Sequence, residues 1–212
     1  MTKQFAKQTN IMSVKFKKNV LISVEDETAV EDFGQLINSG WNIISTGKTA
    51  ARLKLLGIPC KPVDDSRFTE IILNGQMKIL DSNILVGIIA NRERLGDMED
   101  LETYGIMPID MVVMNLPDFK KAPGFKNIDI CGPALIRAAA QNGASVTVVT
   151  DPNDYAQVIK ELLNEGQVRE WTREYLAIKA FEHTSSYDSS IVRWAKKQSL
   201  LGCLFYEEMD FC

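Results

Sequence analysis

The tripeptide Gly47-Lys48-Thr49 follows the apolar segment "WNIIST" and combines the residue types of a phosphate-binding loop: a glycine, a cation and a hydroxyl. A Walker A loop needs another glycine five positions before Gly47, where this chain has Asn42. The sequence therefore argues against a P-loop nucleotide hydrolase. A turn from a strand into a helix still presents free N–H groups and the positive end of a helix dipole. An anion-binding loop and an ordinary helix start with a solvated lysine both fit this stretch.

Composition narrows the kind of protein in which this loop lies. The 212 residues carry 24 Lys and Arg against 28 Asp and Glu, a net charge of −4, which argues against a general binder of nucleic acid or of membrane surfaces. Four widely spaced cysteines without a CxxC pair, together with a single histidine, make a metal site unexpected. The absence of a signal-peptide pattern and of an apolar segment of membrane-spanning length agrees with reduced thiols in a cytoplasmic protein.

The elements that would position this loop alternate along the chain. Apolar segments of strand length begin near Asn19, Trp41, Ile58, Ile84, Ile109 and Ser145. Several are continuous rather than alternating, which is typical of parallel strands buried on both faces. Segments with helical spacing lie between them and end near Gly40, Gly57 and Gly143. This alternation predicts an α/β fold with a doubly wound, mostly parallel sheet.

The C-terminal third of the chain is expected to be helical. Asp151 or Asn153 is a candidate cap for one helix, and residues 169–198 supply one or two more. We divide the chain into an N-terminal segment (1–18), an α/β domain with a C-terminal helical extension (19–198) and an apolar tail (199–212). The tail is apolar for a free end, so we expect it to dock on its own domain or on a partner, which points to a homodimer.

Six segments, in order from Leu21 to Trp194, resemble the IMP cyclohydrolase domain of the bifunctional AICAR transformylase/IMP cyclohydrolase. They are "LISVEDETAVEDFGQLINSGWNIISTGKTA", "FTEIILNGQMKIL", "IDMVVMNL", "IDICGPALIRAAAQN", "VTVVTDPNDYAQVIKELL" and "LAIKAFEHTSSYD". The resemblance implies a methylglyoxal-synthase-like, Rossmann-type fold and the closure of FAICAR to IMP with loss of water, without cofactor or metal. Its ligand would be a purine nucleotide or precursor. The family's transformylase half is not seen, so formyl transfer is not expected here and a separate transformylase is a candidate partner.

The resemblance also implies roles for individual residues. Lys78 matches a lysine of the family's catalytic region that would donate to the formyl oxygen, and Asp129 matches an aspartate that would orient or deprotonate the carboxamide. Gly132 opens a helix whose N–H groups resemble an oxyanion donor. The substrate-binding positions carried over from the family are Ser23, Thr46, Gly47, Thr49 and Asn115.

Departures from the family pattern mostly remove positive charge. Glu27 and Gln76 stand where the family has a lysine and an arginine, and Gln141 replaces a lysine that is a proposed proton donor. Each well-formed charged contact to a phosphate is worth on the order of 1.5–3 kcal/mol. Lys48, in place of a family glycine, is the candidate substitute cation, and Arg137, four positions before Gln141, is a second one.

Three functions therefore remain open from the sequence. The first is a stand-alone IMP cyclohydrolase, the second a diverged cyclase acting on a related or unphosphorylated substrate, and the third a non-catalytic domain that binds a ligand or a partner. His183 is expected to be a hydrogen-bonded structural residue rather than a catalytic one. Cys131 is expected to fill the place of a family glycine.

Overall fold

A parallel sheet forms the centre of the computed structural model, which describes residues 17–63 and 81–198. Within these residues five strands lie in the order β3-β2-β1-β4-β5, and all four neighbouring pairs are parallel. Their bounds are Asn19–Ser23 (β1), Asn42–Ser45 (β2), Lys61–Pro62 (β3), Met111–Met114 (β4) and Thr147–Val149 (β5). The predicted parallel α/β sheet is confirmed.

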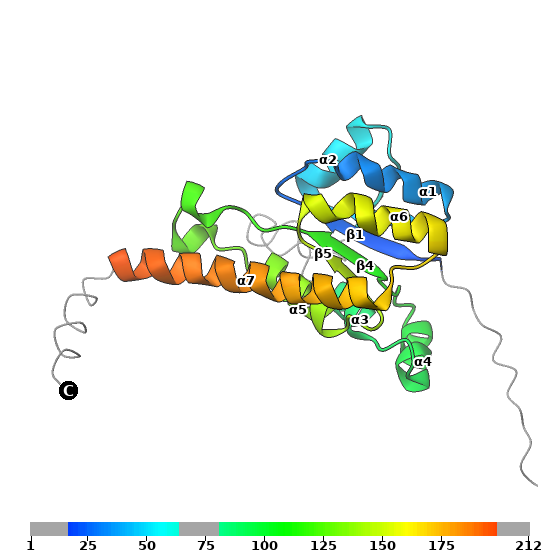
Figure 1. The fold of residues 1–212 in the computed structure, drawn as a ribbon. Helices are drawn as coiled ribbons and strands as arrows, with labels where there is room; N and C mark the ends of the chain where they lie inside the picture. The colour runs from blue at the N-terminus through cyan, green and yellow to red at the C-terminus, as the bar shows by residue number, and fades with distance from the viewer. Residues whose placement is uncertain (1–16, 64–80, 199–212) are drawn as a thin grey trace, which may run out of the picture.

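Helices cover both faces of this sheet (Figure 1). The α-helices are Gln35–Asn38 (α1), Gly47–Leu55 (α2), Ser82–Ile89 (α3), Leu95–Thr103 (α4), Cys131–Gln141 (α5), Tyr155–Glu165 (α6) and Glu170–Gln198 (α7). Short 3-10 turns span Val30–Gly34 (η1), Phe119–Lys121 (η3), Phe125–Asn127 (η4) and Pro152–Asp154 (η5). Helices α1, α2 and α6 lie on one side of the sheet in Figure 1, and α3, α5 and α7 on the other. The sheet is therefore doubly wound.

The central strand β1 shows why its sequence is apolar without interruption. Val20 and Ile22 pack into the cluster shared with η1, α1 and α6, whereas Leu21 packs into the cluster shared with α3 and α5. All three side chains are fully buried. Successive residues of a strand point to opposite faces, so a strand between two helical layers needs apolar residues at every position.

The segment that begins at Ile84 is helical, and our prediction of a strand there is wrong. Residues 82–89 form α3, and the carboxylate of Asp81 accepts the Asn83 N–H as a cap at its start. A short, continuous apolar segment has the same pattern in a buried strand and in a buried helix, so periodicity alone does not separate them. Gly87 packs so closely that an added Cβ would lie 2.3 Å from the Met107 carbonyl oxygen.

Helix α7 is one continuous element of 29 residues, where the sequence allowed one helix or two. Its buried side chains recur about every fourth residue, at Thr172, Leu176, Ala180, Thr184 and Tyr187. This spacing places them on one face of the helix, which packs on α5 and on the edge of the sheet near β5. Of the proposed caps before α6, Asp151 is the one whose side chain accepts an N–H, from Asn153.

Candidate functional site

Loops that could hold a ligand gather at the carboxyl ends of the strands. The strand order reverses between β1 and β4, since the chain winds outward from β1 in one direction and from β4 in the other. Ligands of open α/β sheets bind beyond the carboxyl ends of the strands at such a switch point. Ser23 ends β1, Thr46 follows β2 and Asn115 follows β4, so these three predicted residues lie at the same edge of the sheet.

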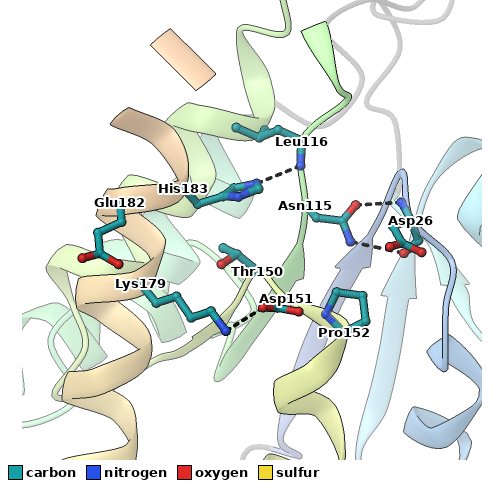
Figure 2. A pocket seen from close by; sticks show the side chains of 9 residues that line it. All are labelled: Asp26, Asn115, Leu116, Thr150, Asp151, Pro152, Lys179, Glu182 and His183. Carbon is teal, nitrogen blue, oxygen red and sulfur yellow. Dashed lines mark hydrogen bonds and ion pairs between the residues drawn. The ribbon is translucent and has the colours of Figure 1, made fainter. Parts of the chain in front are cut away.

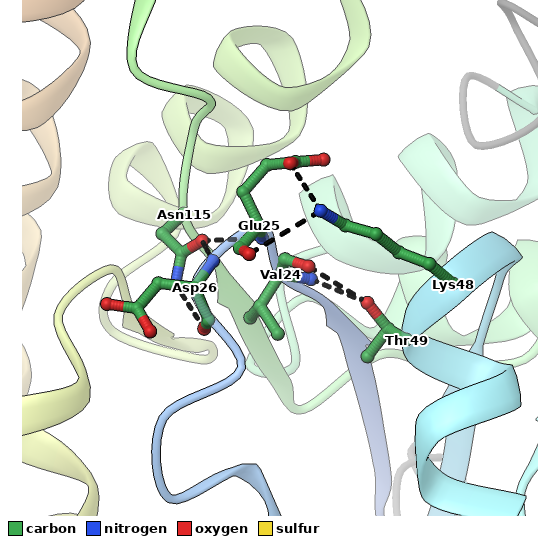
Figure 3. A network of polar contacts seen from close by, with 6 residues as sticks. All are labelled: Val24, Glu25, Asp26, Lys48, Thr49 and Asn115. Atoms are coloured by element: carbon green, nitrogen blue, oxygen red, sulfur yellow. Dashed lines mark hydrogen bonds and ion pairs between the residues drawn. The ribbon is translucent and has the colours of Figure 1, made fainter. Parts of the chain in front are cut away.

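Asn115 holds the loop that follows β1, residues Val24 to Asp26 (Figure 3). Its Oδ1 atom accepts the backbone N–H groups of Glu25 and Asp26 at 2.7 and 2.9 Å. Its Nδ2 atom donates to the Asp26 carbonyl oxygen at 3.2 Å, and the side chain is buried. The amide therefore fixes the backbone of a neighbouring loop, which is a positioning role within this site.

Thr49 ties the same loop to the start of α2. Its hydroxyl donates to the Val24 carbonyl oxygen at 3.1 Å and accepts the Val24 N–H at 3.0 Å. The residue is buried, with only 1% of its surface exposed. Thr49 therefore joins the loop after β1 to the loop after β2, and its hydroxyl is occupied by the backbone rather than presented to a ligand.

Gly47 and Lys48 form the exposed rim of the site. Gly47 opens α2 with a φ of 54°, a conformation that glycine adopts at low cost. The Ala50 N–H bonds back to Thr46, so the N–H groups before it have no acceptor within the helix itself. The Lys48 ammonium group forms an ion pair with the Glu25 carboxylate, and both side chains are about half exposed. Any anion bound at this rim has to compete with Glu25 for the lysine.

A second ion pair lies beside the first. Arg52 Nε is 3.8 Å from the Glu27 carboxylate, which stands where the resembled family has a lysine. The loop after β1 thus carries three acidic residues, Glu25, Asp26 and Glu27. The two cations of α2 that face this loop are each matched by one of these carboxylates, so the surroundings of the Gly47 turn are not strongly positive.

The start of α5 supplies the second half of the site. The Gly132 N–H donates to Asp129 Oδ1 at 3.0 Å, and the Asp129 N–H donates to the Tyr187 hydroxyl of α7 at 2.8 Å. A Cβ atom on Gly132 would lie 2.5 Å from Asp129 Oδ2 and 2.6 Å from Leu116 Cδ2. Only glycine fits between the carboxylate and the residue that follows Asn115, so the predicted residues Asp129, Gly132 and Asn115 are brought together.

A cavity of about 420 Å³ opens beside this arrangement (Figure 2). It is lined by Asp26 after β1, by Asn115 and Leu116 after β4, by Thr150, Asp151 and Pro152 after β5, and by Lys179, Glu182 and His183 of α7. Three of these side chains are carboxylates and one is an ammonium group. The cavity is therefore better suited to a neutral or cationic group than to a phosphate.

His183 is hydrogen-bonded, as expected. Its Nε2 atom accepts the Leu116 N–H at 3.1 Å, which places the ring proton on Nδ1. Burial lowers the pKa of His183 from its ordinary value of 6.5, and Asp151 only partly opposes this shift. The imidazole is therefore kept neutral, in the form that can accept the Leu116 N–H.

Lys179 joins α7 to the loop after β5. Its ammonium group lies 2.7 Å from carboxylate oxygens of both Asp151 and Asp154. Burial alone would lower the pKa of Lys179, but the hydrogen bonds to these two carboxylates outweigh it and raise the pKa. The lysine is thereby held in place in the cavity wall, charged and already paired.

Tyr155, the first residue of α6, follows directly after the turn η5, whose Pro152 lines the cavity. The side chain of Tyr155 is fully buried, and its hydroxyl has no hydrogen-bond partner within the described residues. Burial raises the pKa of Tyr155, and the nearby carboxylates of Asp26 and Asp151 raise it further. The phenol of Tyr155 therefore stays protonated.

Comparison with known proteins identifies the family. The profile of the MGS-like domain family matches residues 28–150. The chain belongs to the MGS-like domain family. The profile described as AICARFT/IMPCHase bienzyme matches residues 139–209 as well.

This MGS-like domain has curated relatives that are longer than it is. The bifunctional purine biosynthesis protein PurH of Streptococcus mutans serotype c is 41% identical over 191 residues, which make up 85% of this chain and 37% of PurH. PurH of Streptococcus uberis is 40% identical over the same shares. The chain thus spans 37% of the length of these relatives. A crystal structure of ForH superposes with a TM-score of 0.74 at 30% identity, and the match covers 83% of this chain and 97% of ForH.

Two of the predicted site residues do not join the others in this MGS-like domain. Lys78, the predicted catalytic lysine, lies outside the described residues, as does Gln76. Arg137 is exposed on α5, where its guanidinium group lies 5.6 Å from the ring centre of Phe181, in a groove between α5 and α7. The structure therefore places the Arg137 side chain against α7 rather than in the cavity wall.

Lys179 and Glu182 help to line the cavity, and we predicted no site role for either residue. Lys179 lies three positions before Glu182 and four before His183 in "KAFEHTSSY", a spacing that puts these polar groups on neighbouring faces of one helix. That spacing could have identified Lys179 and Glu182 as site residues.

Within residues 17–63 and 81–198, no group of three His, Cys, Asp or Glu side chains is placed to hold a metal ion. No helix in the same ranges is long and apolar enough to cross a membrane.

Proposed function

We propose that this chain acts in purine biosynthesis as an IMP cyclohydrolase that closes FAICAR to IMP with loss of water. The likeness to PurH, named a bifunctional purine biosynthesis protein, supports the broader role. The observation that carries the specific reaction is the placement of Asp129, Gly132 and Leu116 in contact beside the loop that Asn115 holds. This arrangement provides a carboxylate and a helix start at the end of the sheet where ligands bind.

The ring closure divides into two steps. The carboxamide nitrogen of FAICAR attacks the formyl carbon, a C–N bond forms, and the formyl oxygen becomes a hydroxyl. That hydroxyl then leaves as water when the former formamido nitrogen loses its proton and forms the C=N double bond to the former formyl carbon, while the former carboxamide nitrogen keeps its remaining proton. Asp129 takes the amide proton with Oδ2, because Oδ1 already accepts the Gly132 N–H. Lys78 donates to the formyl oxygen.

Positioning supplies a large part of the acceleration in this proposal. Both reacting groups belong to one molecule, and holding such groups in a reactive geometry can be worth about 7–11 kcal/mol of the barrier. Asn115 and Thr49 fix the loop after β1, while His183 and Tyr187 fix the chain at Leu116 and Asp129. A site that has lost several cations can therefore retain catalysis if these backbone positions remain fixed.

The phosphate end of the substrate is assigned to the Gly47 turn. The loop after β1 lies between this turn and the acidic cavity, since Asp26 and Asn115 face the cavity and Lys48 lies beyond Glu25 (Figures 2 and 3). The N–H groups at the start of α2 and the Lys48 ammonium group are the donors available there. The carboxylates of the cavity would repel a phosphate dianion.

The experiment is a direct assay of ring closure, in which the absorbance of the purine product is recorded over time. We expect purified protein to accelerate conversion of FAICAR to IMP, and Asp129→Asn to lower kcat by about 100-fold or more. Asp100→Asn, which removes an exposed carboxylate from α4, is the matched control and should leave the rate unchanged. A rate no faster than buffer, or equal rates for the parent and Asp129→Asn, would overturn the proposal.

A second candidate is a cyclase for an unphosphorylated substrate. The ion pairs of Lys48 with Glu25 and of Arg52 with Glu27 favour it, because they occupy the cations on which a phosphate would depend. Binding of IMP and of inosine, both measured calorimetrically, separates the two candidates. Tighter binding of IMP supports the phosphorylated substrate, whereas equal or tighter binding of inosine supports the second candidate.

A further inference from the structure

Acidic side chains from three separate elements line the cavity beside the site. Asp26 lies in the loop after β1, Asp151 in the loop after β5 and Glu182 on α7. Lys179 is the only cation among the described residues of this lining, and its ammonium group is shared between Asp151 and Asp154. The cavity therefore keeps an excess of negative charge, which favours a cationic ligand.

Asp26 provides a carboxylate in a fixed position. Its Oδ1 atom accepts the Thr28 N–H at 3.0 Å, and Asn115 binds both its backbone N–H and its carbonyl oxygen. Within residues 17–63 and 81–198, no cation forms an ion pair with Asp26. A charged group that is already ordered loses little freedom when it binds a ligand. The Oδ2 atom of Asp26 is therefore an available acceptor for an ammonium group.

Thr150 lines the same cavity with a hydroxyl group that has no partner. Only 5% of the residue is exposed, and Figure 2 shows its side chain between Lys179 and Asn115. In the part of the chain that the structure describes, no hydrogen bond involves this hydroxyl. Buried polar groups are nearly always hydrogen-bonded, because an unpaired one costs free energy. The unpaired hydroxyl of Thr150 therefore indicates a polar ligand in the cavity.

His183 adds a hydrogen-bond donor near Thr150. Its Nε2 atom accepts the Leu116 N–H, so the ring proton lies on Nδ1, and no described residue accepts a hydrogen bond from it. In Figure 2 His183 and Thr150 lie toward α7, whereas Asp26 lies across the cavity from them. One side thus offers a donor and a hydroxyl, which suit a neutral oxygen atom, and the other offers a carboxylate, which suits an ammonium group.

The sheet fixes the separation of these two sides. Asp26 follows β1 and Thr150 follows β5, and β4 lies between the two strands. Neighbouring strands lie about 4.8 Å apart, so the ends of β1 and β5 are about 10 Å apart. A single metal ion cannot contact both sides over this span, whereas a short organic chain can. The volume of about 420 Å³ is within the usual range for small-molecule sites.

We propose that this cavity binds a small primary amine that carries a neutral oxygen group at the other end of a short aliphatic chain. The ammonium group donates to Asp26 Oδ2, and the oxygen group binds the His183 Nδ1–H and the Thr150 hydroxyl. The aliphatic chain lies against Leu116 and Pro152, which are apolar residues of the lining.

The first test is calorimetric binding of three probes to the full chain at about pH 7.5. The probe 4-aminobutan-1-ol carries both end groups, butane-1,4-diol lacks the charge, and butylamine lacks the oxygen. We expect 4-aminobutan-1-ol to bind with a dissociation constant of about 1 mM or tighter. Butane-1,4-diol should bind about tenfold more weakly or worse, and butylamine about threefold more weakly or worse, because a charged hydrogen bond contributes more than a neutral one.

Three variants locate the ligand within the chain. Asp26→Asn should weaken binding of 4-aminobutan-1-ol by about tenfold or more, and Thr150→Val by about threefold or more. Thr150→Val replaces the hydroxyl by a methyl group of similar size and breaks no hydrogen bond of the described chain, so the variant should fold. Thr150→Ser keeps the hydroxyl and should bind as the parent does. Asp100→Asn, on an exposed part of α4, is the matched control and should also bind as the parent does.

NMR provides a second location test, because the only histidine of the chain lines this cavity. The signal of the His183 C2 proton should shift as 4-aminobutan-1-ol is added and saturate at the concentrations found by calorimetry. The proposal is overturned by any of three results: no binding of 4-aminobutan-1-ol, equal binding of butane-1,4-diol, or unchanged binding in both Asp26→Asn and Thr150→Val. Binding that leaves the His183 signal unmoved also overturns it.

The proposed amine site stands apart from the proposed ring closure. Neither Asp129 nor Gly132 lines this cavity, and neither binding measurement uses FAICAR or IMP. A chain that binds the amine without closing FAICAR would support this site and overturn the cyclohydrolase proposal. A chain that closes FAICAR without binding the amine would do the reverse.

Discussion

The protonation state of His183 determines whether its ring can bind the backbone of the loop after β4. Because Nε2 accepts the Leu116 N–H, the hydrogen bond exists only while the imidazole is neutral. Burial lowers the pKa of this group from 6.5. His183 is the only histidine of the chain, so its C2 proton gives one resolvable NMR signal. We predict that this signal titrates with a midpoint below 6.5; a midpoint at or above 6.5 would contradict the hydrogen bond.

The same shift predicts how stability depends on pH. The folded pKa of His183 is lower than the unfolded one, so the unfolded chain binds the proton first as the pH falls. The stabilising contribution is complete above about pH 6.5 and declines as the pH falls through the folded pKa. His183→Gln retains an acceptor without this titration. Urea unfolding at about pH 7.5 and pH 5.5 should show a larger loss of stability for the parent than for His183→Gln.

We predict that substitutions of Glu25 and of Lys48 change anion binding in opposite directions. Glu25→Gln releases the Lys48 ammonium group and removes a negative charge from the rim, so IMP should bind about fivefold more tightly, as expected for one exposed charge. Lys48→Gln should weaken binding by a similar factor. The measurement is calorimetric, and both differences should shrink at high salt. If both variants bind IMP as the parent does, the phosphate does not lie at the Gly47 turn.

The exposed Glu25–Lys48 pair should matter little for folding. Ion pairs between exposed side chains contribute about 0–1 kcal/mol, because solvent screens them and ordering two long side chains costs entropy. Both side chains are about half exposed. Changes in ligand binding in these two variants can therefore be interpreted without a large correction for stability.

The sequence predicted which residues lie at the site, but it did not predict their hydrogen-bond partners. Asn115 was predicted to be at the site and lies there, yet its amide is occupied by a loop 89 and 90 residues earlier in the chain. Likewise Asp129 is held by Tyr187, 58 residues later. Such contacts depend on how α7 packs on the sheet, and no local pattern encodes that packing.

At the scale of elements, the contact between α5 and the loop after β4 depends on Gly132. A methyl group there would lie within 2.6 Å of both Asp129 and Leu116. We predict that Gly132→Ala displaces Asp129, destabilises the protein by about 1–3 kcal/mol through overpacking, and abolishes ring closure. Gly96→Ala is the matched control, because a Cβ at Gly96 in α4 meets nothing within 4 Å. Thermal unfolding and the FAICAR assay provide the two measurements, and wild-type values for Gly132→Ala in both would refute this contact.

The strands were predictable to different degrees. Strands β1, β2, β4 and β5 were predictable because a strand between two helical layers is apolar on both faces, and each of the four contains at least two adjacent apolar residues. Strand β3 is only two residues long, and its start near Ile58 was placed too early. Helix α3 was mistaken for a strand because its mean composition is as apolar as that of a buried strand, and its cap at Asp81 is a single residue. The sequence therefore predicted the alternation of strands and helices well, but it did not distinguish a strand from a helix in a short apolar segment.

At the scale of the whole molecule, α7 contacts three of the segments that form the site. Along this helix, Lys179 reaches the loop after β5, His183 the loop after β4, and Tyr187 the start of α5. These three residues are spaced four apart, so they form one row along the helix. A displacement of α7 would therefore move three loops together, and this row is a means by which the fold keeps the site in one geometry.

Substitution of Lys179 tests whether α7 holds the loop after β5 in place. Lys179→Met removes the ammonium group but keeps most of the apolar chain, and it leaves Asp151 and Asp154 facing each other without a cation. The side chain is 25% exposed, so we predict a loss of about 1–2 kcal/mol at neutral pH. Lys160→Met on exposed α6 is the matched control and should change stability by less than about 0.5 kcal/mol.

The pH dependence of the stability loss in Lys179→Met shows whether the loss comes from the ion pair or from reduced packing. The hydrogen bond from Lys179 lowers the pKa of Asp151 below 3.8. Its stabilising contribution is therefore present above about pH 4 and is lost as the pH falls through the folded pKa. Denaturant unfolding of the parent and of Lys179→Met should give curves that differ at neutral pH and converge in acid. A difference that stays constant down to about pH 3 would mean that Lys179 acts through its methylene groups and that the charged contact does not hold α7 in place.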